Sequence, residues 1–142
     1  MTSAPTAFVT VYTDGSAINH GQSAKTRAGY GIYYGQGNSN NVSAPLKGPD
    51  QSSSRAEVQA IVVALQRALS GGYTIVIRSD AGTVIDVLNG LSTPSANTDL
   101  VNQAKQTIEE MRSNRLSVKL EKVSREQNAD AHKLAVEGAN KA

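Results

Sequence analysis

The stretch RAEVQAIVVALQRALSGGYTIVIRSD, residues 55–80, decides the fold because its hydrophobic pattern changes period halfway along. Apolar residues recur at helical spacing over residues 55–69 and also fill the other faces, which predicts a helix that is buried nearly all round. Gly71 and Gly72 end that helix. The β-branched run at 73–78 then predicts a buried strand. A buried helix that leads into a buried strand is typical of α/β proteins.

The sequence before this stretch predicts strands. Residues 7–13 are rich in Val, Thr and Tyr, and Asp14-Gly15 is a turn signal that we expect to end the strand. A polar loop at 16–27 leads to further strands at 28–34 and 42–46. Pro45 places the third strand at an edge of the sheet, because proline cannot donate a ladder hydrogen bond.

The sequence after it predicts more helices and one more strand. We expect helices at 81–88, 98–112 and 128–140 and a strand at 116–123. The element order is then β-β-β-α-β-α-α-β-α. This order predicts an α/β fold in a single domain, residues 1–142, with a five-stranded mixed sheet flanked by helices.

Composition narrows the class of protein. The 142 residues include no cysteine, which excludes disulfides and thiolate metal sites and suits a reducing compartment. No stretch is typical of a signal peptide or a membrane span. We therefore expect an intracellular protein, cytoplasmic or nuclear, that makes no membrane contact and acts as a monomer. The net charge of +2 is compatible with nucleic-acid binding but does not argue for it.

Three acids carry the chemistry. Asp14 ends the first predicted strand, Glu57 lies in the first turn of the first helix, and Asp80 ends the fourth strand. If these two strands are neighbours, the acids gather at one edge of the sheet. Clustered carboxylates repel each other unless they share a cation, and hard oxygen ligands select Mg²⁺ or Mn²⁺. Two such ions roughly 4 Å apart clamp a phosphodiester.

Each acid also has a purely structural interpretation. Asp14 before Gly15 suits a turn. Glu57 lies three residues after Ser54, as in a capping box. Asp80 suits an N-cap of the helix that begins at residue 81. A capping role does not exclude a metal role, and the three acids together favour a metal site.

Four motifs carry a family resemblance. The segments YTDGS at 12–16, SRAE at 54–57, RSD at 78–80 and NADAHKLA at 128–135 resemble, in order, the signatures of the ribonuclease H type 1 family, especially its eukaryotic-type members. The resemblance implies the ribonuclease H fold. It also implies an endonuclease that hydrolyses the RNA strand of RNA–DNA hybrids with two Mg²⁺ or Mn²⁺ ions, held by Asp14, Glu57, Asp80 and a fourth residue.

The fourth position departs from the family pattern. His132 stands where the family has a carboxylate, and Asp130 precedes it by two residues. Two residues on a helix are about 200° apart, so only one of them faces the site. We take His132 as the fourth catalytic and metal-binding residue and keep Asp130 as the alternative. An imidazole ligand suits Mn²⁺ better than Mg²⁺. The competing interpretation is an exposed helix histidine without a ligand role.

The resemblance also implies contacts with the hybrid. Asn19, Ser53 and Ser54 are candidates for 2′-hydroxyl or base-edge contacts. Lys25, Arg27 and Arg55 are candidates for phosphate contacts. Many members carry a histidine in the loop before the last helix, which assists proton transfer or product release. The loop at 123–128 lacks it, so Arg125 or Glu126 is expected to take over this role. The segment 89–99 lacks the basic, Trp-rich protrusion of many members, which predicts weaker hybrid binding.

Two other functions remain open at this point. The first is a catalytically inactive ribonuclease H-like domain that binds nucleic acid or protein, and His132 is its best support. The second is a nuclease of the same fold that acts on another substrate, such as DNA, because a fold alone does not fix the substrate.

Overall fold

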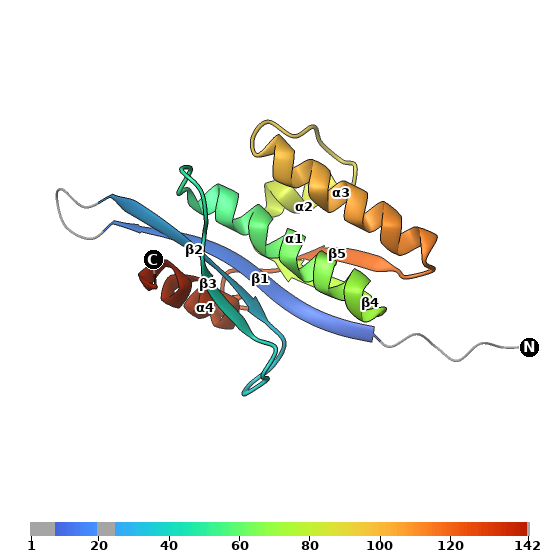
Figure 1. Ribbon diagram of the computed structural model, residues 1–142, viewed down its shortest axis with the longest axis horizontal. Coiled ribbons are helices and arrows are strands. Elements are labelled where there is room, and N and C mark those ends of the chain that lie inside the picture. Colours follow the sequence, from blue (N-terminus) through green and yellow to red (C-terminus); the bar gives the residue numbers. More distant parts are fainter. Residues whose placement is uncertain (1–7, 20–24, 142) are drawn as a thin grey trace, which may run out of the picture.

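The computed structural model describes residues 8–19 and 25–141. The described chain forms a five-stranded sheet and four helices (Figure 1), in the order that the sequence predicts. The strands are β1 (Phe8–Asn19), β2 (Thr26–Tyr33), β3 (Val42–Pro45), β4 (Thr74–Ser79) and β5 (Val118–Lys122). The helices are α1 (Ser53–Gly71), α2 (Gly82–Leu88), α3 (Thr98–Ser113) and α4 (Ala129–Asn140).

The sheet is mixed, with the strand order β3-β2-β1-β4-β5. β1 pairs antiparallel with β2, and β2 pairs antiparallel with β3. On its other side β1 pairs parallel with β4, which in turn pairs parallel with β5. β3 is therefore an edge strand, as Pro45 predicts. The fold class expected from the sequence is confirmed.

β1 is longer than expected. The prediction that Asp14-Gly15 ends the strand is wrong, because β1 continues to Asn19 and pairs with β2 along the way, from Asp14 opposite Gly31 to Asn19 opposite Thr26. Residues 16–19 and 26–27 of the predicted polar loop are therefore strand. The first residue of the strand predicted at 7–13 and the middle of the loop predicted at 16–27, residues 20–24, lie outside the described residues.

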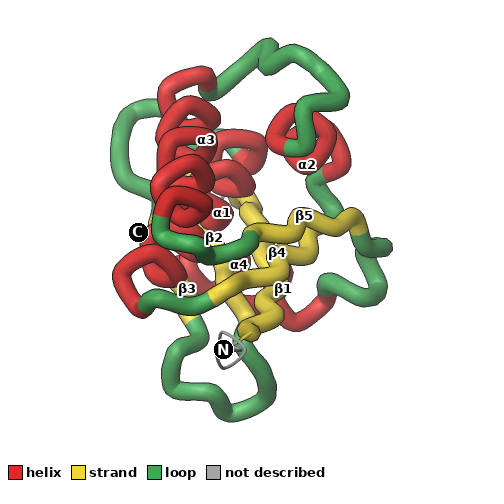
Figure 2. Tube along the Cα trace, turned by 90° about the vertical axis from the view of Figure 1, so that its right-hand side faces the viewer, coloured by secondary structure: helices red, strands yellow, loops and turns green. Residues whose placement is uncertain are grey.

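Helices cover the two faces of the sheet differently. α1 and α3 lie on one side and α4 lies on the other (Figures 1 and 2). Glycines in the strands permit these contacts: a Cβ on Gly15 would collide with the backbone nitrogen of Glu57 in α1, and a Cβ on Gly31 would lie 2.5 Å from the carbonyl oxygen of Ala131 in α4. Both helices therefore rest directly on strand backbone.

The main core is aliphatic and lies around α1. Its largest fully buried side chains are Ile32, Ile61, Leu65, Ile75, Ile77, Ile85 and Met111. α1 packs against the sheet on one side and against α3 on the other. The expected burial nearly all round is only partly confirmed, because Val63 is half-buried and Gln66 and Ser70 are exposed. None of the helices in the described part of the chain combines the length and apolar character needed to cross a bilayer.

The close contact between β2 and α4 predicts that Gly31→Ala is destabilising. The new methyl group would lie 2.5 Å from the carbonyl oxygen of Ala131 and 2.7 Å from the nitrogen of Ala135, and backbone cannot give way cheaply. We expect the free energy of unfolding to fall by about 1–3 kcal/mol in urea denaturation. Gly82→Ala is the matched control, because the nearest atom to its added Cβ is a flexible lysine carbon at 3.8 Å. Equal stability of the two variants would contradict this account of the packing.

Candidate active site

Strand register brings Asp14 and Asp80 together. The last residue pair between the parallel strands β1 and β4 is Thr13 opposite Ser79, and the two acids follow directly. The expected juxtaposition of the two strand carboxylates is thus confirmed. The side chain of Asp14 is only 6% exposed, whereas the side chain of Asp80, at the start of the connection to α2, is 17% exposed.

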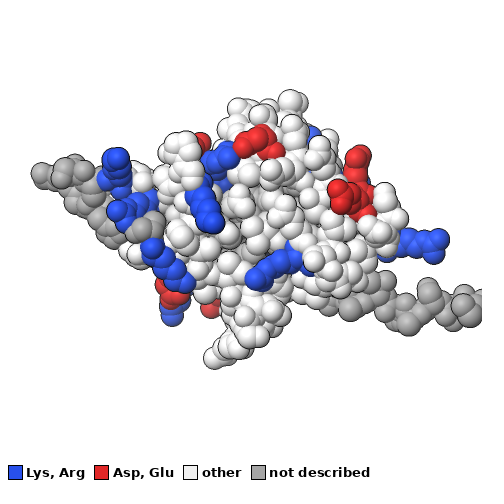
Figure 3. All heavy atoms as spheres, viewed as in Figure 1, with Lys and Arg blue, Asp and Glu red and all other residues white. Residues whose placement is uncertain are grey.

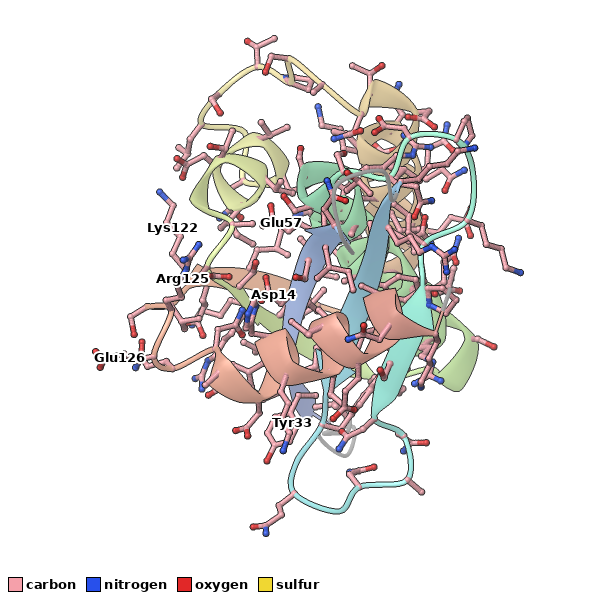
Figure 4. All side chains as sticks on the ribbon, turned by 90° about the vertical axis from the view of Figure 1, so that its left-hand side faces the viewer. Asp14, Tyr33, Glu57, Lys122, Arg125 and Glu126 are labelled. Carbon is pink, nitrogen blue, oxygen red and sulfur yellow. The ribbon has the colours of Figure 1, made fainter. Side chains whose placement is uncertain are left out.

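Glu57 approaches from α1. The N-cap of this helix is Ser52, whose hydroxyl oxygen accepts a hydrogen bond of 3.1 Å from the backbone N–H of Arg55. The helix therefore begins two residues earlier than predicted, and Glu57 lies in its second turn. The alternative interpretation of a capping box between Ser54 and Glu57 does not hold, because Ser52 is the N-cap of α1. Contact between Gly15 and the α1 backbone sets Glu57 beside Asp14 (Figure 4).

Asp80 does not cap α2 either. The N-cap residue is Ala81, and its N–H donates to the hydroxyl oxygen of Ser79 at 3.0 Å. The carboxylate of Asp80 has other partners: Oδ1 accepts a hydrogen bond of 2.9 Å from Nδ2 of Asn128, and Oδ2 lies 3.7 Å from Nε of Arg125. The alternative interpretation of Asp80 as an N-cap does not hold, because Ser79 supplies the acceptor at this turn.

His132 is the α4 residue that the structure brings to the acids. Its Nδ1 lies 2.9 Å from Oδ2 of Asp14, and its side chain is 56% exposed. With Asp14 ionised, the Nδ1–H tautomer of His132 donates in this contact and Nε2 is left for another partner. Asp130 is exposed and lies about 200° around the same helix. The geometry therefore favours His132 over Asp130 as the fourth residue.

Burial and neighbouring carboxylates raise the pKa of Glu57 and the pKa of Asp14. Burial and the charges of Asp14 and Asp80 raise the pKa of Glu57 to about 7, although Arg125 opposes the shift. Burial and the charge of Asp80 also raise the pKa of Asp14, against the hydrogen bond from His132. This mutual repulsion is what a bound cation relieves.

The donor set fits a hard divalent cation. Asp14 and Asp80 both act electrostatically on Glu57, and carboxylate oxygens are the ligands that Mg²⁺ and Mn²⁺ prefer. Within residues 8–19 and 25–141, however, no three His, Asp or Glu side chains are already arranged closely enough to hold a metal ion. Rotation of these side chains would therefore accompany binding, with Asp14, Glu57, Asp80 and His132 as the holding residues.

A cleft opens beside the acids. It has a volume of about 410 Å³ and lies between the start of α1, α2 and the segment at 94–97. Glu57 and Asp80 line it, together with the polar side chains of Ser54, Thr83 and Asn97. The side-chain amide of Asn97 donates to the hydroxyl oxygen of Ser54 at 3.1 Å, which joins two of its walls.

Arg55 is engaged within the protein. Its guanidinium makes two hydrogen bonds to the carboxylate of Asp99, at 3.0 and 2.8 Å. This fork ties the start of α1 to the start of α3, and the hydrogen bonds from Arg55 lower the pKa of Asp99 to about 2. A phosphate contact by Arg55 would have to compete with this ion pair. Ser53 is exposed in the first turn of α1 and is open to solvent.

The other predicted substrate contacts lie away from the acids. Asn19 ends β1, Lys25 directly precedes β2 and Arg27 is the second residue of β2, and all three are exposed. Asn19 is five residues beyond Asp14, or about 17 Å along an extended strand. Lys and Arg side chains gather at this end of the molecule (Figure 3), where the β1–β2 ribbon projects (Figure 1).

The loop before α4 contributes Arg125 rather than Glu126. Arg125 is 93% exposed and reaches Asp80, whereas Glu126 is exposed and points outward (Figure 4). Sequence reasoning missed Asn128, which is fully buried against Thr13 and Asp80. The available signal was its position four residues before His132, which places both on one face of the helix.

Comparison with known proteins defines the class. A family model described as RNase H matches residues 6–140, and the chain therefore belongs to the RNase H family. The chain is 37% identical over 107 residues to the Ribonuclease H of Schizosaccharomyces pombe, which covers 66% of this chain and 39% of that protein. It is 43% identical over 61 residues to Ribonuclease H1 of Homo sapiens, which covers 43% of this chain and 21% of that protein. The chain thus spans less than half the length of these curated relatives.

Solved structures show the same fold. RNase H1 from the halophilic archaeon Halobacterium salinarum NRC-1 superposes with a TM-score of 0.66 at 22% identity, covering 96% of this chain and 100% of that chain. LC11-RNase H1, solved in complex with an RNA/DNA hybrid, superposes with a TM-score of 0.68 at 22% identity, covering 94% of this chain and 97% of that chain.

The raised pKa of Glu57 predicts a pH-dependent stability. In metal-free protein the folded state keeps this proton to about pH 7, whereas the unfolded chain releases it near pH 4.5. The contribution of Glu57 to the free energy of unfolding therefore falls as pH rises through this window. Glu57→Gln removes this loss of stability. We therefore expect the free energy of unfolding of the variant, relative to that of wild type, to rise by about 1–2 kcal/mol from pH 4 to pH 8. Solvent screening reduces this figure because Glu57 is only half-buried.

Urea denaturation in EDTA at the two pH values measures this difference. The exposed Glu109→Gln variant is the control and should change little between them. A Glu57→Gln variant that follows the pH dependence of wild type would contradict the assignment of a raised pKa to Glu57.

Proposed function

We propose that this chain is an endonuclease that hydrolyses the RNA strand of RNA–DNA hybrids with two divalent ions. The observation that carries the proposal is the convergence of Asp14, Glu57 and Asp80 where the parallel pairing of β1 and β4 ends, with His132 in contact with Asp14. Relatives named Ribonuclease H and a neighbour solved with an RNA/DNA hybrid support it.

The protein residues in this proposal have distinct tasks. Bound divalent ions would supply Lewis-acid chemistry, which activates water and stabilises the leaving oxygen. Asp14, Glu57 and Asp80 provide the anionic oxygens that hold them. Arg125, at 3.7 Å from Asp80, offers a mobile positive charge at the rim that can leave Asp80 for a phosphate.

The cleft beside the acids is the proposed binding site for the RNA strand that is cleaved. Hydroxyl and amide groups of Ser54, Thr83 and Asn97 line it, and such groups can read a 2′-hydroxyl. Lys25 and Arg27, at the ribbon end, would meet phosphates farther along the hybrid. An intracellular location, cytoplasmic or nuclear, and action as a monomer belong to the same proposal.

The first test is cleavage of a labelled RNA–DNA hybrid in Mg²⁺ and in Mn²⁺. We expect cleavage of the RNA strand, no cleavage of the DNA duplex of the same sequence, and a loss of at least about 100-fold in Asp14→Asn, because the variant lacks an anionic ligand at the centre of the site. The matched control is Asp130→Asn, an exposed acid on α4, which should retain wild-type activity. A folded wild-type protein that is inactive with both metals would leave a binding domain as the better description. Cleavage of both duplexes would instead indicate a nuclease of broader substrate range.

His132 makes the preference between metals testable. The site carries one carboxylate fewer than a four-acid site, and imidazole is a better ligand for Mn²⁺ than for Mg²⁺. We expect His132→Asp to raise the ratio of Mg²⁺-supported to Mn²⁺-supported kcat by about tenfold. His132→Ala should lower activity with Mn²⁺ more than activity with Mg²⁺. Unchanged ratios in both variants would remove His132 from the site.

A further inference from the structure

Asn128 is a fully buried polar residue directly before α4 whose side chain does not cap the helix. Its Nδ2 donates two hydrogen bonds, one to the backbone carbonyl of Thr13 and one to Oδ1 of Asp80, both at 2.9 Å. Thr13 directly precedes Asp14, so one amide group reaches both strands at the point where the two acids emerge.

The orientation of this amide follows from its partners. A carbonyl and a carboxylate can only accept, so the atom that faces both must be the nitrogen. The oxygen is left buried with no hydrogen-bond partner among the described atoms. A buried acceptor without a partner is unfavourable. That Asn128 adopts this orientation indicates that the two hydrogen bonds from Nδ2 determine how the side chain is placed.

α4 thereby attaches to both strand carboxylates from its first turn. Asn128 and His132 are four residues apart, joined by a hydrogen bond of 3.0 Å from the backbone N–H of His132 to the carbonyl of Asn128. His132 contacts Asp14 while Asn128 contacts Asp80. These two contacts fix the separation of the acids across the β1–β4 pair.

The contact also distinguishes the two oxygens of Asp80. Oδ1 is engaged by Asn128, whereas Oδ2 faces the exposed Arg125. The oxygen on the solvent side is therefore the one available to a ligand that displaces Arg125.

We propose that Asn128 is a positioning residue for the metal site, which holds Asp80 with Oδ2 outward and keeps Asp80 in register with Asp14. The inference rests on the proposed function for the identity of the ligand. Partners that orient a metal-binding carboxylate typically change metal affinity or activity by 10- to 100-fold when they are removed.

Two substitutions test this assignment. Asn128→Asp keeps the shape of the side chain but removes the nitrogen donor that faces Asp80, and Asn128→Ala removes both hydrogen bonds. For each variant we expect a dissociation constant for Mn²⁺ at least about tenfold weaker, measured by electron paramagnetic resonance on the protein without nucleic acid. We expect kcat for a hybrid to fall by a similar factor while KM changes less than about twofold. The control is Asn140→Asp on the same helix, which loses a comparable bond to the carbonyl of Val136 at 3.1 Å.

A measurement on the wild-type protein keeps the inference testable if the variants fail to fold. In a Mg²⁺ titration followed by ¹⁵N–¹H NMR, the side-chain amide signals of Asn128 should shift together with the backbone signal of Asp80, whereas those of Asn140 should not. Folded variants with wild-type Mn²⁺ affinity and kcat would overturn the assignment. So would side-chain amide signals of Asn128 that do not shift at saturating Mg²⁺. Wild-type protein that cleaves no hybrid would count against the proposed nuclease, and the Mg²⁺ titration would still decide the role of Asn128.

Discussion

Direct contact between helix backbone and strand backbone is the constraint on which the rest of this structure depends. At Gly15 the backbone of α1 lies where a side chain would be, and at Gly29 and Gly31 the backbone of α4 does the same on the opposite face. Successive residues of a strand face opposite sides of the sheet. Gly15 of β1 lies opposite Tyr30, between Gly29 and Gly31 of β2, so α1 and α4 pack on opposite faces at nearly the same position along these strands. Glu57 and His132 therefore reach the region of Asp14 from two sides of one sheet.

This arrangement places charge where the solvent screens it poorly. Two strand carboxylates and one helix carboxylate lie close together, and burial with mutual repulsion raises the pKa of both Asp14 and Glu57. His132, Asn128 and Arg125 provide hydrogen bonds or positive charge to this group. Clusters of ionisable groups with perturbed pKa values are typical of functional sites, and this one lies where the pairing of β1 and β4 ends.

The surroundings of the site are built from short segments. The chain at 94–97 forms one wall of the cleft, and Asn97 joins it to α1 through Ser54 with a backbone in the left-handed region, at φ 55°. Arg55 and Asp99 reinforce the same junction between α1 and α3. The basic end of the β1–β2 ribbon lies well away from this wall.

The sequence by itself determined the order of the elements, the edge position of β3 and the candidates Asp14, Glu57 and Asp80, because these depend on local periodicity and on short motifs. Only the tertiary structure decided where β1 ends, which serine caps α1, that Arg55 is bound to Asp99 and that Asn128 holds Asp80. The Asp14-Gly15 pair has the local preference of a turn, yet pairing with β2 and packing beneath α1 keep it extended. Such contacts join residues far apart in the chain, and their free energy exceeds the small local preferences that a sequence pattern reports.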